Sequence, residues 1–132
     1  MNGIKAQFID HLSFVVKDLQ TTEEFYSKFL GEPIIKNDGL IVFKVGNIRL
    51  FFKLSPKEIP NQNYDKDDIG VNHIGLGVRT IEELKKFEEH LSVVGIKHSE
   101  FKTGKFGNEY IWFDDPSGIR LEIYHRPLEP RA

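Results

Sequence analysis

The sequence contains one internal repeat, and this repeat limits the possible folds more than any other feature. Residues 8–16 (FIDHLSFVV) resemble residues 70–78 (GVNHIGLGV), and each run places a His two residues after an apolar residue. His11 and His73 therefore occupy equivalent positions, 73 − 11 = 62 residues apart. Both runs are rich in residues that favour strands, so the repeat predicts two copies of one structural unit, each opening with a strand.

A predicted helix follows each of these strands. The patterns Thr-Thr-Glu-Glu and Thr-Ile-Glu-Glu fit capping boxes, with Thr21 and Thr80 as the N-caps. Gly31 and Gly95 follow the apolar stripes, where a glycine can end a helix in the left-handed conformation. The apolar stripes consist of Leu19, Phe25, Phe29 and Leu30 in the first helix and Leu84, Phe87, Leu91 and Val94 in the second.

Three predicted strands then complete each copy. They cover about 33–37, 40–45 and 48–54 in the first copy and about 96–102, 108–114 and 119–125 in the second. The last strands share the tripeptide Ile-Arg-Leu at residues 48–50 and 119–121, an offset of 119 − 48 = 71. We therefore expect an α+β fold of two βαβββ modules, at about 7–55 and 70–127, joined by a polar linker at 56–69 within a single domain of residues 1–132.

Composition excludes several classes of function. The formal charge of −2 offers no bulk attraction to nucleic acid or to an anionic membrane, so we expect neither partner. No apolar run approaches the roughly 20 residues of a membrane span, and residues 1–6 show no signal-peptide core. The absence of cysteine excludes thiolate metal sites and a cysteine nucleophile, and fits a cytoplasmic protein.

Strand alternation brings candidate metal ligands onto shared faces. His11 shares its face with Ser13, His73 shares its face with small glycines, and Glu122 lies on the last strand of the second module. Two His and one carboxylate suit Mn, Fe, Co, Ni or Zn with open coordination positions. The alternative for each residue is ordinary: a hydrogen-bonded structural His or a solvated Glu.

Other residues are candidates for the wall of a substrate pocket. A hydroxyl can bond a substrate oxygen, aromatic rings can hold an apolar part, and Lys or Arg can bind an anion. The alternatives are core packing for the aromatic residues and solvent exposure for the charged ones, and His90, His98 and His125 are expected to be structural or surface residues. The pocket candidates are Ser13, Arg49, Phe51, Lys102, Tyr110, Trp112 and Arg120.

Two segments resemble a known superfamily. One is residues 9–19 (IDHLSFVVKDL) with residues 25–31 (FYSKFLG), and the other is residues 110–123 (YIWFDDPSGIRLEI). The second is similar to an F-x-D-P-D-G-x-x-x-E ending, with Ser117 in place of the second Asp. On these segments the chain resembles the vicinal oxygen chelate, or glyoxalase/bleomycin resistance/dioxygenase, superfamily. The resemblance implies curved, half-barrel sheets around a metal cavity, with ligands drawn from the first and last strands of the modules.

The resemblance also implies a ligand set and a function. It maps metal ligands to His11, His73 and Glu122, while the shared tripeptide aligns the fourth family position with Phe51, which cannot bind metal. A three-ligand set resembles fosfomycin-modifying enzymes and extradiol dioxygenases more than glyoxalase I. We therefore expect a divalent-metal-dependent lyase or isomerase, transferase or dioxygenase that acts on a small oxygen-rich substrate.

Two other functions stay open at this point. The first is a metal-independent protein that sequesters a drug, as bleomycin resistance proteins do, and the second is an interaction domain with a vestigial site. The resemblance also implies a homodimer, in which the cavity can be built from modules of two chains.

Overall fold

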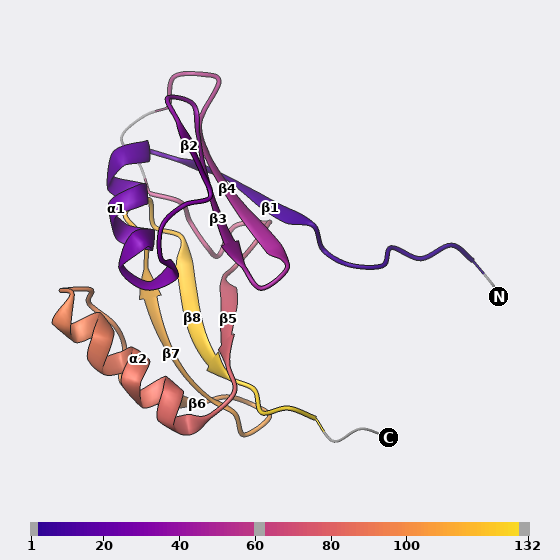
Figure 1. The fold of residues 1–132 in the computed structure, drawn as a ribbon, viewed down its shortest axis with the longest axis vertical. Coiled ribbons are helices and arrows are strands. Elements are labelled where there is room, and N and C mark those ends of the chain that lie inside the picture. Colours follow the sequence, from indigo (N-terminus) through magenta and orange to yellow (C-terminus); the bar gives the residue numbers. More distant parts are fainter. Residues whose placement is uncertain (1–2, 60–62, 130–132) are drawn as a thin grey trace. The chain divides into compact units, whose positions relative to one another are not determined.

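The structure is a computed structural model that describes residues 3–59 and 63–129 (Figure 1). The chain divides into two compact units, residues 1–61 and 62–132, each with its own sheet and helix. The predicted linker at 56–69 includes residues 60–62, which lie outside the described residues. Among the described residues, no helix is both long and apolar enough to cross a membrane.

The first unit is a four-stranded mixed sheet with one helix. Its sheet order is β1-β4-β3-β2, with β1 and β4 parallel and the other neighbours antiparallel. The helix packs on β3 and β4, and Tyr26 fills the interface with its ring centroid 4.4 Å from that of Phe52. The elements are β1 (His11–Val16), α1 (Leu19–Leu30), β2 (Ile35–Asn37), β3 (Leu40–Val45) and β4 (Ile48–Leu54).

The second unit repeats this arrangement. Its sheet order is β5-β8-β7-β6, again with one parallel pair, β5 and β8, and α2 packs against β5, β7 and β8. The predicted α+β fold of two βαβββ modules is confirmed, and neither sheet closes on itself. The elements are β5 (Ile74–Val78), α2 (Ile81–Val93), β6 (Lys102–Thr103), β7 (Glu109–Asp114) and β8 (Arg120–His125).

The strand register shows that Phe51 and Glu122 are equivalent. In the first unit Ser13 pairs with Phe51, and in the second Gly75 pairs with Glu122. Ser13 and Gly75 each lie two residues after the repeated His, so the alignment through Ile-Arg-Leu holds in three dimensions. Phe52 lies on the opposite face and is 0% exposed, because successive side chains of a strand alternate between faces.

The helix starts confirm one capping prediction and correct the other. Thr80 caps α2 as predicted: its Oγ1 accepts from the Glu83 N–H, and the Glu83 carboxylate accepts from the Thr80 N–H. The prediction of Thr21 as N-cap is wrong, because α1 begins at Leu19. Asp18 is the cap, and the Thr21 backbone N–H donates to its carboxylate at 2.8 Å. This hydrogen bond is the main reason that the pKa of Asp18 is lowered.

The expected strand at 96–102 is mostly wrong, since only Lys102–Thr103 forms β6. Ser99 interrupts the ladder to β7. Its own N–H donates to the Trp112 carbonyl, but the Trp112 N–H donates to the Ser99 hydroxyl rather than to a backbone carbonyl. A side chain has thus replaced one main-chain partner, and regular pairing begins only at Lys102.

The turn before β8 is held by a buried carboxylate. Asp115 Oδ1 accepts from the Ser117 N–H at 2.8 Å and from the Ile119 N–H at 2.9 Å. Gly118 has a φ of 89°, a conformation that favours glycine, and a Cβ there would lie 2.9 Å from the Asn63 side chain. The Asp-Pro-Ser-Gly sequence therefore fixes where β8 starts, and with it the position of Glu122.

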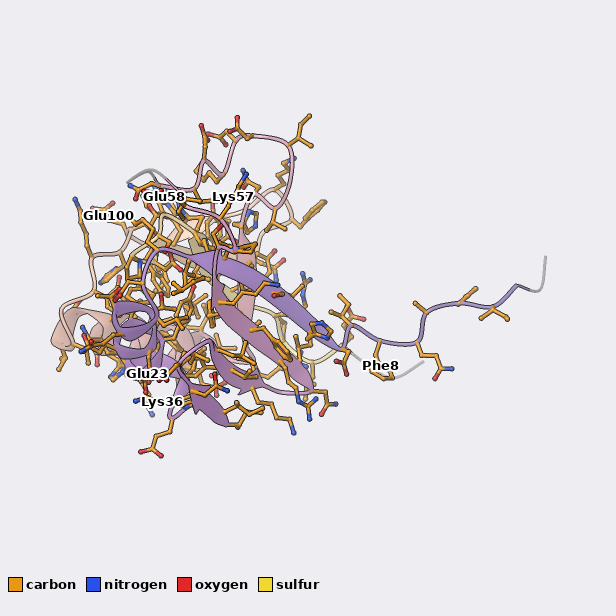
Figure 2. The ribbon with its side chains drawn as sticks, turned by 90° about the horizontal axis from the view of Figure 1, so that it is seen from above. Phe8, Glu23, Lys36, Lys57, Glu58 and Glu100 are labelled. Carbon is orange, nitrogen blue, oxygen red and sulfur yellow. The ribbon has the colours of Figure 1, made fainter. Side chains whose placement is uncertain are left out.

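Charged and apolar side chains lie on the surface of the first unit (Figure 2). Lys36 of β2 reaches Glu23 of α1, with 2.9 Å between Nζ and Oε1. Phe8 lies in the segment that leads into β1 and is exposed, as are Ile4 and Ile9 nearby.

Candidate functional site

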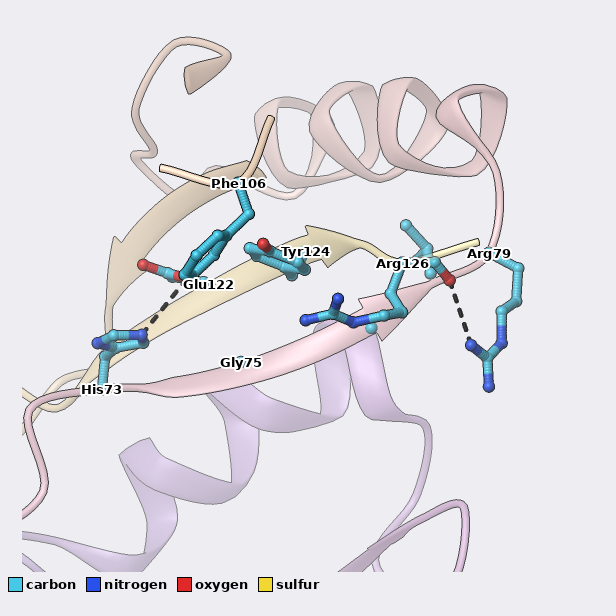
Figure 3. A pocket seen from close by; sticks show the side chains of 9 residues that line it. His73, Gly75, Arg79, Phe106, Glu122, Tyr124 and Arg126 are labelled. Atoms are coloured by element: carbon cyan, nitrogen blue, oxygen red, sulfur yellow. Dashed lines mark hydrogen bonds and ion pairs between the residues drawn. The ribbon is translucent and has the colours of Figure 1, made fainter. Parts of the chain in front are cut away.

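The second unit contains a pocket of about 510 Å³ along the seam between β5 and β8 (Figure 3). His73, Gly75 and Gly77 form one side by strand alternation, and Glu122 and Tyr124 form the other. Phe106, on the loop between β6 and β7, adds an apolar wall and is 87% exposed. The pocket thus combines polar groups at fixed strand positions with an aromatic surface, as ligand sites do.

Two of the predicted metal ligands meet in this pocket. His73 Nε2 lies 3.5 Å from Glu122 Oε1, and the Glu122 side chain is only 17% exposed (Figure 3). The gap is longer than a charge-assisted hydrogen bond, typically about 2.7–2.9 Å. Two donor atoms on one metal, each with a bond of about 2.1 Å, can be at most roughly 4.2 Å apart, and the distance between His73 Nε2 and Glu122 Oε1 lies within this limit. One cation can therefore contact both atoms without movement of the backbone.

The hydrogen bonds of Asn72 determine which nitrogen of His73 carries the proton. The Asn72 amide nitrogen lies 2.9 Å from the Lys66 carbonyl oxygen and 3.2 Å from Asp67 Oδ1, so it donates to both. Its amide oxygen, 2.8 Å from His73 Nδ1, must then accept, and His73 Nδ1 is the donor. Neutral His73 consequently presents an unprotonated Nε2 to the pocket, the form that binds a metal.

Asp67 helps to hold Asn72 in this orientation. Its carboxylate accepts hydrogen bonds from Lys66 Nζ, at 3.0 and 3.1 Å, and from the Asn72 amide nitrogen. The hydrogen bond and positive charge of Lys66 lower the pKa of Asp67, with a smaller contribution from Asn72. Asp67 therefore stays ionised at neutral pH and remains an acceptor for the Asn72 side chain.

The first unit places His11 in the same local setting but with a different neighbour. His11 Nδ1 lies 2.8 Å from Asp10 Oδ2, so the carboxylate of the preceding residue orients the ring as Asn72 does for His73. Where the second unit has Glu122, the first has Phe51, whose ring stacks on His11 with centroids 4.8 Å apart. The first unit thus offers one nitrogen ligand, and the second offers a nitrogen and an oxygen.

The donor set fits a divalent metal of the borderline class, for which imidazole nitrogen and carboxylate oxygen are ordinary ligands. No third His, Asp or Glu joins His73 and Glu122 among the described residues of the second unit. The assignment of His11, His73 and Glu122 as one ligand set stays a prediction.

The other predicted pocket residues are not among those that line this pocket. Arg120 is held in place: its Nε donates to Asp114 Oδ1 at 2.6 Å, and its guanidinium carbon lies 3.8 Å from the Trp112 ring centroid. Tyr110 stacks on Tyr124 with centroids 6.2 Å apart. In the rest of the set, Lys102 is an exposed residue of β6, and Ser13, Arg49 and Phe51 belong to β1 and β4 of the first unit.

Sequence reasoning missed two groups of residues. Asp10 and Asn72 orient the histidines, and their signal is plain in retrospect, since each directly precedes the repeated His. Arg79 and Arg126 line the pocket at the end away from His73 and Glu122. Strand alternation could have found them, because Arg79 continues the face of His73 and Arg126 continues the face of Glu122.

The histidines that we expected to be structural have protein partners. His98 lies between the Ser92 hydroxyl, 2.8 Å from Nε2, and the Ser99 carbonyl, 2.7 Å from Nδ1. His125 Nδ1 is 3.3 Å from Glu109 Oε2. These contacts occupy both nitrogens of His98 and one nitrogen of His125.

The chain is similar to several known proteins in sequence or in fold. It is 28% identical over 126 residues to the metallothiol transferase FosB of Bacillus licheniformis, an alignment that covers 94% of this chain and 79% of that protein. A glyoxalase family protein from Enterococcus faecalis superposes with a TM-score of 0.74 at 25% identity, covering 90% of this chain and 98% of that one.

A putative glyoxalase from Bacillus halodurans has a TM-score of 0.78 at 19% identity, covering 89% and 95% of the two chains, a likeness of fold alone. The family model described as Glyoxalase/Bleomycin resistance protein/Dioxygenase superfamily matches residues 8–123. The chain therefore belongs to the glyoxalase/bleomycin resistance protein/dioxygenase superfamily.

Proposed function

We propose that this protein is a divalent-metal-dependent enzyme that acts on a small, oxygen-rich substrate, with His11, His73 and Glu122 as the metal ligands. The observation that carries the proposal is the pair formed by His73 and Glu122. The two side chains are 3.5 Å apart, and the hydrogen bond from His73 Nδ1 to Asn72 leaves Nε2 as the unprotonated nitrogen of the neutral ring. A merely structural His would not need this orientation toward a carboxylate inside a pocket.

A divalent cation bound by these residues would stabilise negative charge on two neighbouring substrate oxygens. The protein's own contribution is position and environment. Asn72 fixes the His73 ring, and the Phe106 and Tyr124 rings make part of the pocket lining apolar. Gly75 leaves space beside both ligands, because a Cβ at that position would meet no atom within 4 Å.

Among the possible reactions, group transfer to the substrate is the one that we favour. Phe51 occupies the place of a fourth ligand, so the site keeps more open positions than a four-ligand site. The similarity to a protein named as a metallothiol transferase supports the same reaction class, transfer of a thiol. This chain has no cysteine, so the thiol would have to be a separate small molecule.

The competing function is sequestration of a drug without metal. Acetohydroxamate, a small chelator with two neighbouring oxygens, distinguishes the two by calorimetry on metal-free and Co(II)-loaded protein. We expect binding only after loading, with a change in the Co(II) absorption spectrum. Equal binding by both forms, with an unchanged spectrum, would contradict a metal-dependent function and favour sequestration.

The role of Asn72 gives a prediction of its own. Asn72→Ala removes the acceptor for His73 Nδ1–H, so the affinity for Co(II) should fall by about ten-fold or more. Asn72→Asp keeps an acceptor at the same position, as Asp10 does for His11, and should retain most of the affinity. Both are measured by metal titration. Equal affinity in Asn72→Ala and the unsubstituted protein would show that the hydrogen bond does not serve metal binding.

We also propose that the protein is a homodimer located in the cytoplasm. The family resemblance supports the dimer, and the lack of cysteine fits a reducing compartment. Sedimentation at micromolar concentration should give twice the chain mass of 15.3 kDa. A species of the single-chain mass would contradict the dimer and leave the metal ligands of each chain as proposed.

A further inference from the structure

The pocket of the second unit has two chemically different ends (Figure 3). His73 and Glu122 lie at one end, and Arg79 and Arg126 lie at the other, beyond Tyr124. The Arg126 guanidinium points back along the pocket toward Glu122. The pairing of β8 with β5 extends to this end, because the Arg126 N–H donates to the Val78 carbonyl at 2.9 Å.

The two arginines are held in place by a backbone carbonyl and an aromatic ring. Arg79 Nη1 donates to the Arg126 backbone carbonyl at 3.2 Å, and the Arg126 guanidinium carbon lies 5.0 Å from the Tyr124 ring centroid. Within residues 3–59 and 63–129, no carboxylate forms an ion pair with either guanidinium. Arg120 differs, since Asp114 neutralises it. Most N–H donors of Arg79 and Arg126 are therefore available to an anion.

Gly75 and Gly77 form the floor of the pocket between its two ends, and they leave space above the strand. A Cβ at Gly75 would meet nothing within 4 Å, and one at Gly77 would make only an ordinary contact at 3.9 Å. Neither glycine has a positive φ, so the backbone does not require glycine at these positions. Because glycine weakens a strand, the space it leaves is the feature that accounts for its presence here.

We propose that this pocket binds a two-ended ligand, with neighbouring oxygens at the His73–Glu122 end and an oxyanion, such as a carboxylate, held by Arg126 and Arg79. The inference rests on the proposed metal-dependent function for the first end only. Four residues of strand from Glu122 to Arg126 rise about 13 Å, and the backward-pointing Arg126 side chain shortens the gap. The ligand is thus a short linear molecule, either the substrate or a carboxylate-bearing cosubstrate.

A pair of matched hydroxamates tests the anionic end. Adipic acid monohydroxamate and hexanohydroxamate share a chelating head and a six-carbon chain, and only the first has a terminal carboxylate. On Co(II)-loaded protein, we expect the carboxylate form to bind about ten-fold tighter, with the difference shrinking as salt is raised. Arg79→Gln and Arg126→Gln should each reduce the difference, whereas Lys86→Gln, an equal charge loss on the exposed face of α2, should not.

A metal-free measurement keeps this inference separate from the proposed function. Adipate added to metal-free protein should shift the guanidinium NMR signals of Arg79 and Arg126, and not those of Arg120. If both hydroxamates bind equally and adipate shifts neither signal, the anionic end is overturned while the metal site stands. If neither hydroxamate binds loaded protein but adipate still shifts both signals, the metal-dependent function fails and the anion site stands.

Sulfate and adipate then distinguish the possible oxyanions and their sources. If adipate shifts the arginine signals at a lower concentration than sulfate or phosphate does, the arginine end of the pocket is assigned to a carboxylate. The reverse order would assign it to a sulfate- or phosphate-like group. The Arg79 signal can also be followed in the Arg126→Gln variant. If the anion shifts it as much there as in the unsubstituted protein, the role of Arg126 is overturned.

Discussion

His73→Ala and Glu122→Ala are each expected to lower the affinity for Co(II) or Zn(II) by about 100-fold or more. The reason is that the two side chains supply neighbouring donors 3.5 Å apart, so removal of either leaves the cation with a single protein ligand in the second unit. Competition titration against a chromophoric chelator measures the effect over this range. Loss of a ligand should not unfold the protein, because His73 is exposed and Glu122 lies on the pocket face of β8 rather than in the core.

His90→Ala is the matched control, since it removes an exposed imidazole of α2 that does not line the pocket. Its metal affinity should equal that of the unsubstituted protein. His11→Ala separates two possibilities within the ligand set. A loss comparable to His73→Ala would support His11 as the third ligand, whereas no change would limit the site to the second unit.

Phe51→Glu should raise metal affinity by about ten-fold, the second large effect. The β1–β4 register puts residue 51 where the second unit has Glu122, and its ring already contacts His11. A carboxylate there recreates the His–Glu pair of the second unit and adds a negatively charged ligand. Titration with Co(II) should show tighter binding and a changed absorption spectrum, because the coordination shell would gain an oxygen.

Phe52→Glu is the control for register. Phe52 is 0% exposed and packs against Tyr26 and Phe14, so a buried carboxylate there should destabilise the fold by several kcal/mol. Urea denaturation of both variants measures this difference. If Phe51→Glu is as destabilised as Phe52→Glu, or if its metal affinity and Co(II) spectrum are unchanged, then residue 51 does not face the ligands.

The repeat in the sequence was enough to predict much of the fold. His11 and His73, the paired helices and the shared Ile-Arg-Leu tripeptide are features that local pattern encodes directly, because strand alternation and helix stripes follow from side-chain geometry. The register of Phe51 and Glu122 followed from the tripeptide alone and is confirmed by strand pairing.

Other features depended on competing local hydrogen bonds. Asp18 and Thr21 are both residue types that suit an N-cap. In the structure Asp18 is the N-cap, and its carboxylate accepts from the Thr21 N–H. Ser99 reads as part of a strand, but its hydroxyl replaces a main-chain acceptor of β7. Sequence patterns rank such alternatives poorly, because each differs from its rival by about one hydrogen bond.

The sequence predicts two residues of the pocket and little of their surroundings. Residue type and strand position point to His73 and Glu122, and the structure brings them into one pocket. Arg79 and Arg126 each lie one residue beyond a strand end, so strand alternation finds them only if it is continued past the strand. The sequence predicts Arg120 as an anion binder, but only contacts in three dimensions show that Asp114 and Trp112 hold it.

Metal content tests the central claim most directly. The full chain should be purified without a metal-affinity tag or chelator and analysed for Mn, Fe, Co, Ni and Zn, then titrated with each metal. We predict close to one divalent metal per chain, either as purified or after titration, and its loss in Glu122→Ala. A protein that carries no such metal and binds none of the five on addition would contradict the assignment of His73 and Glu122 as metal ligands.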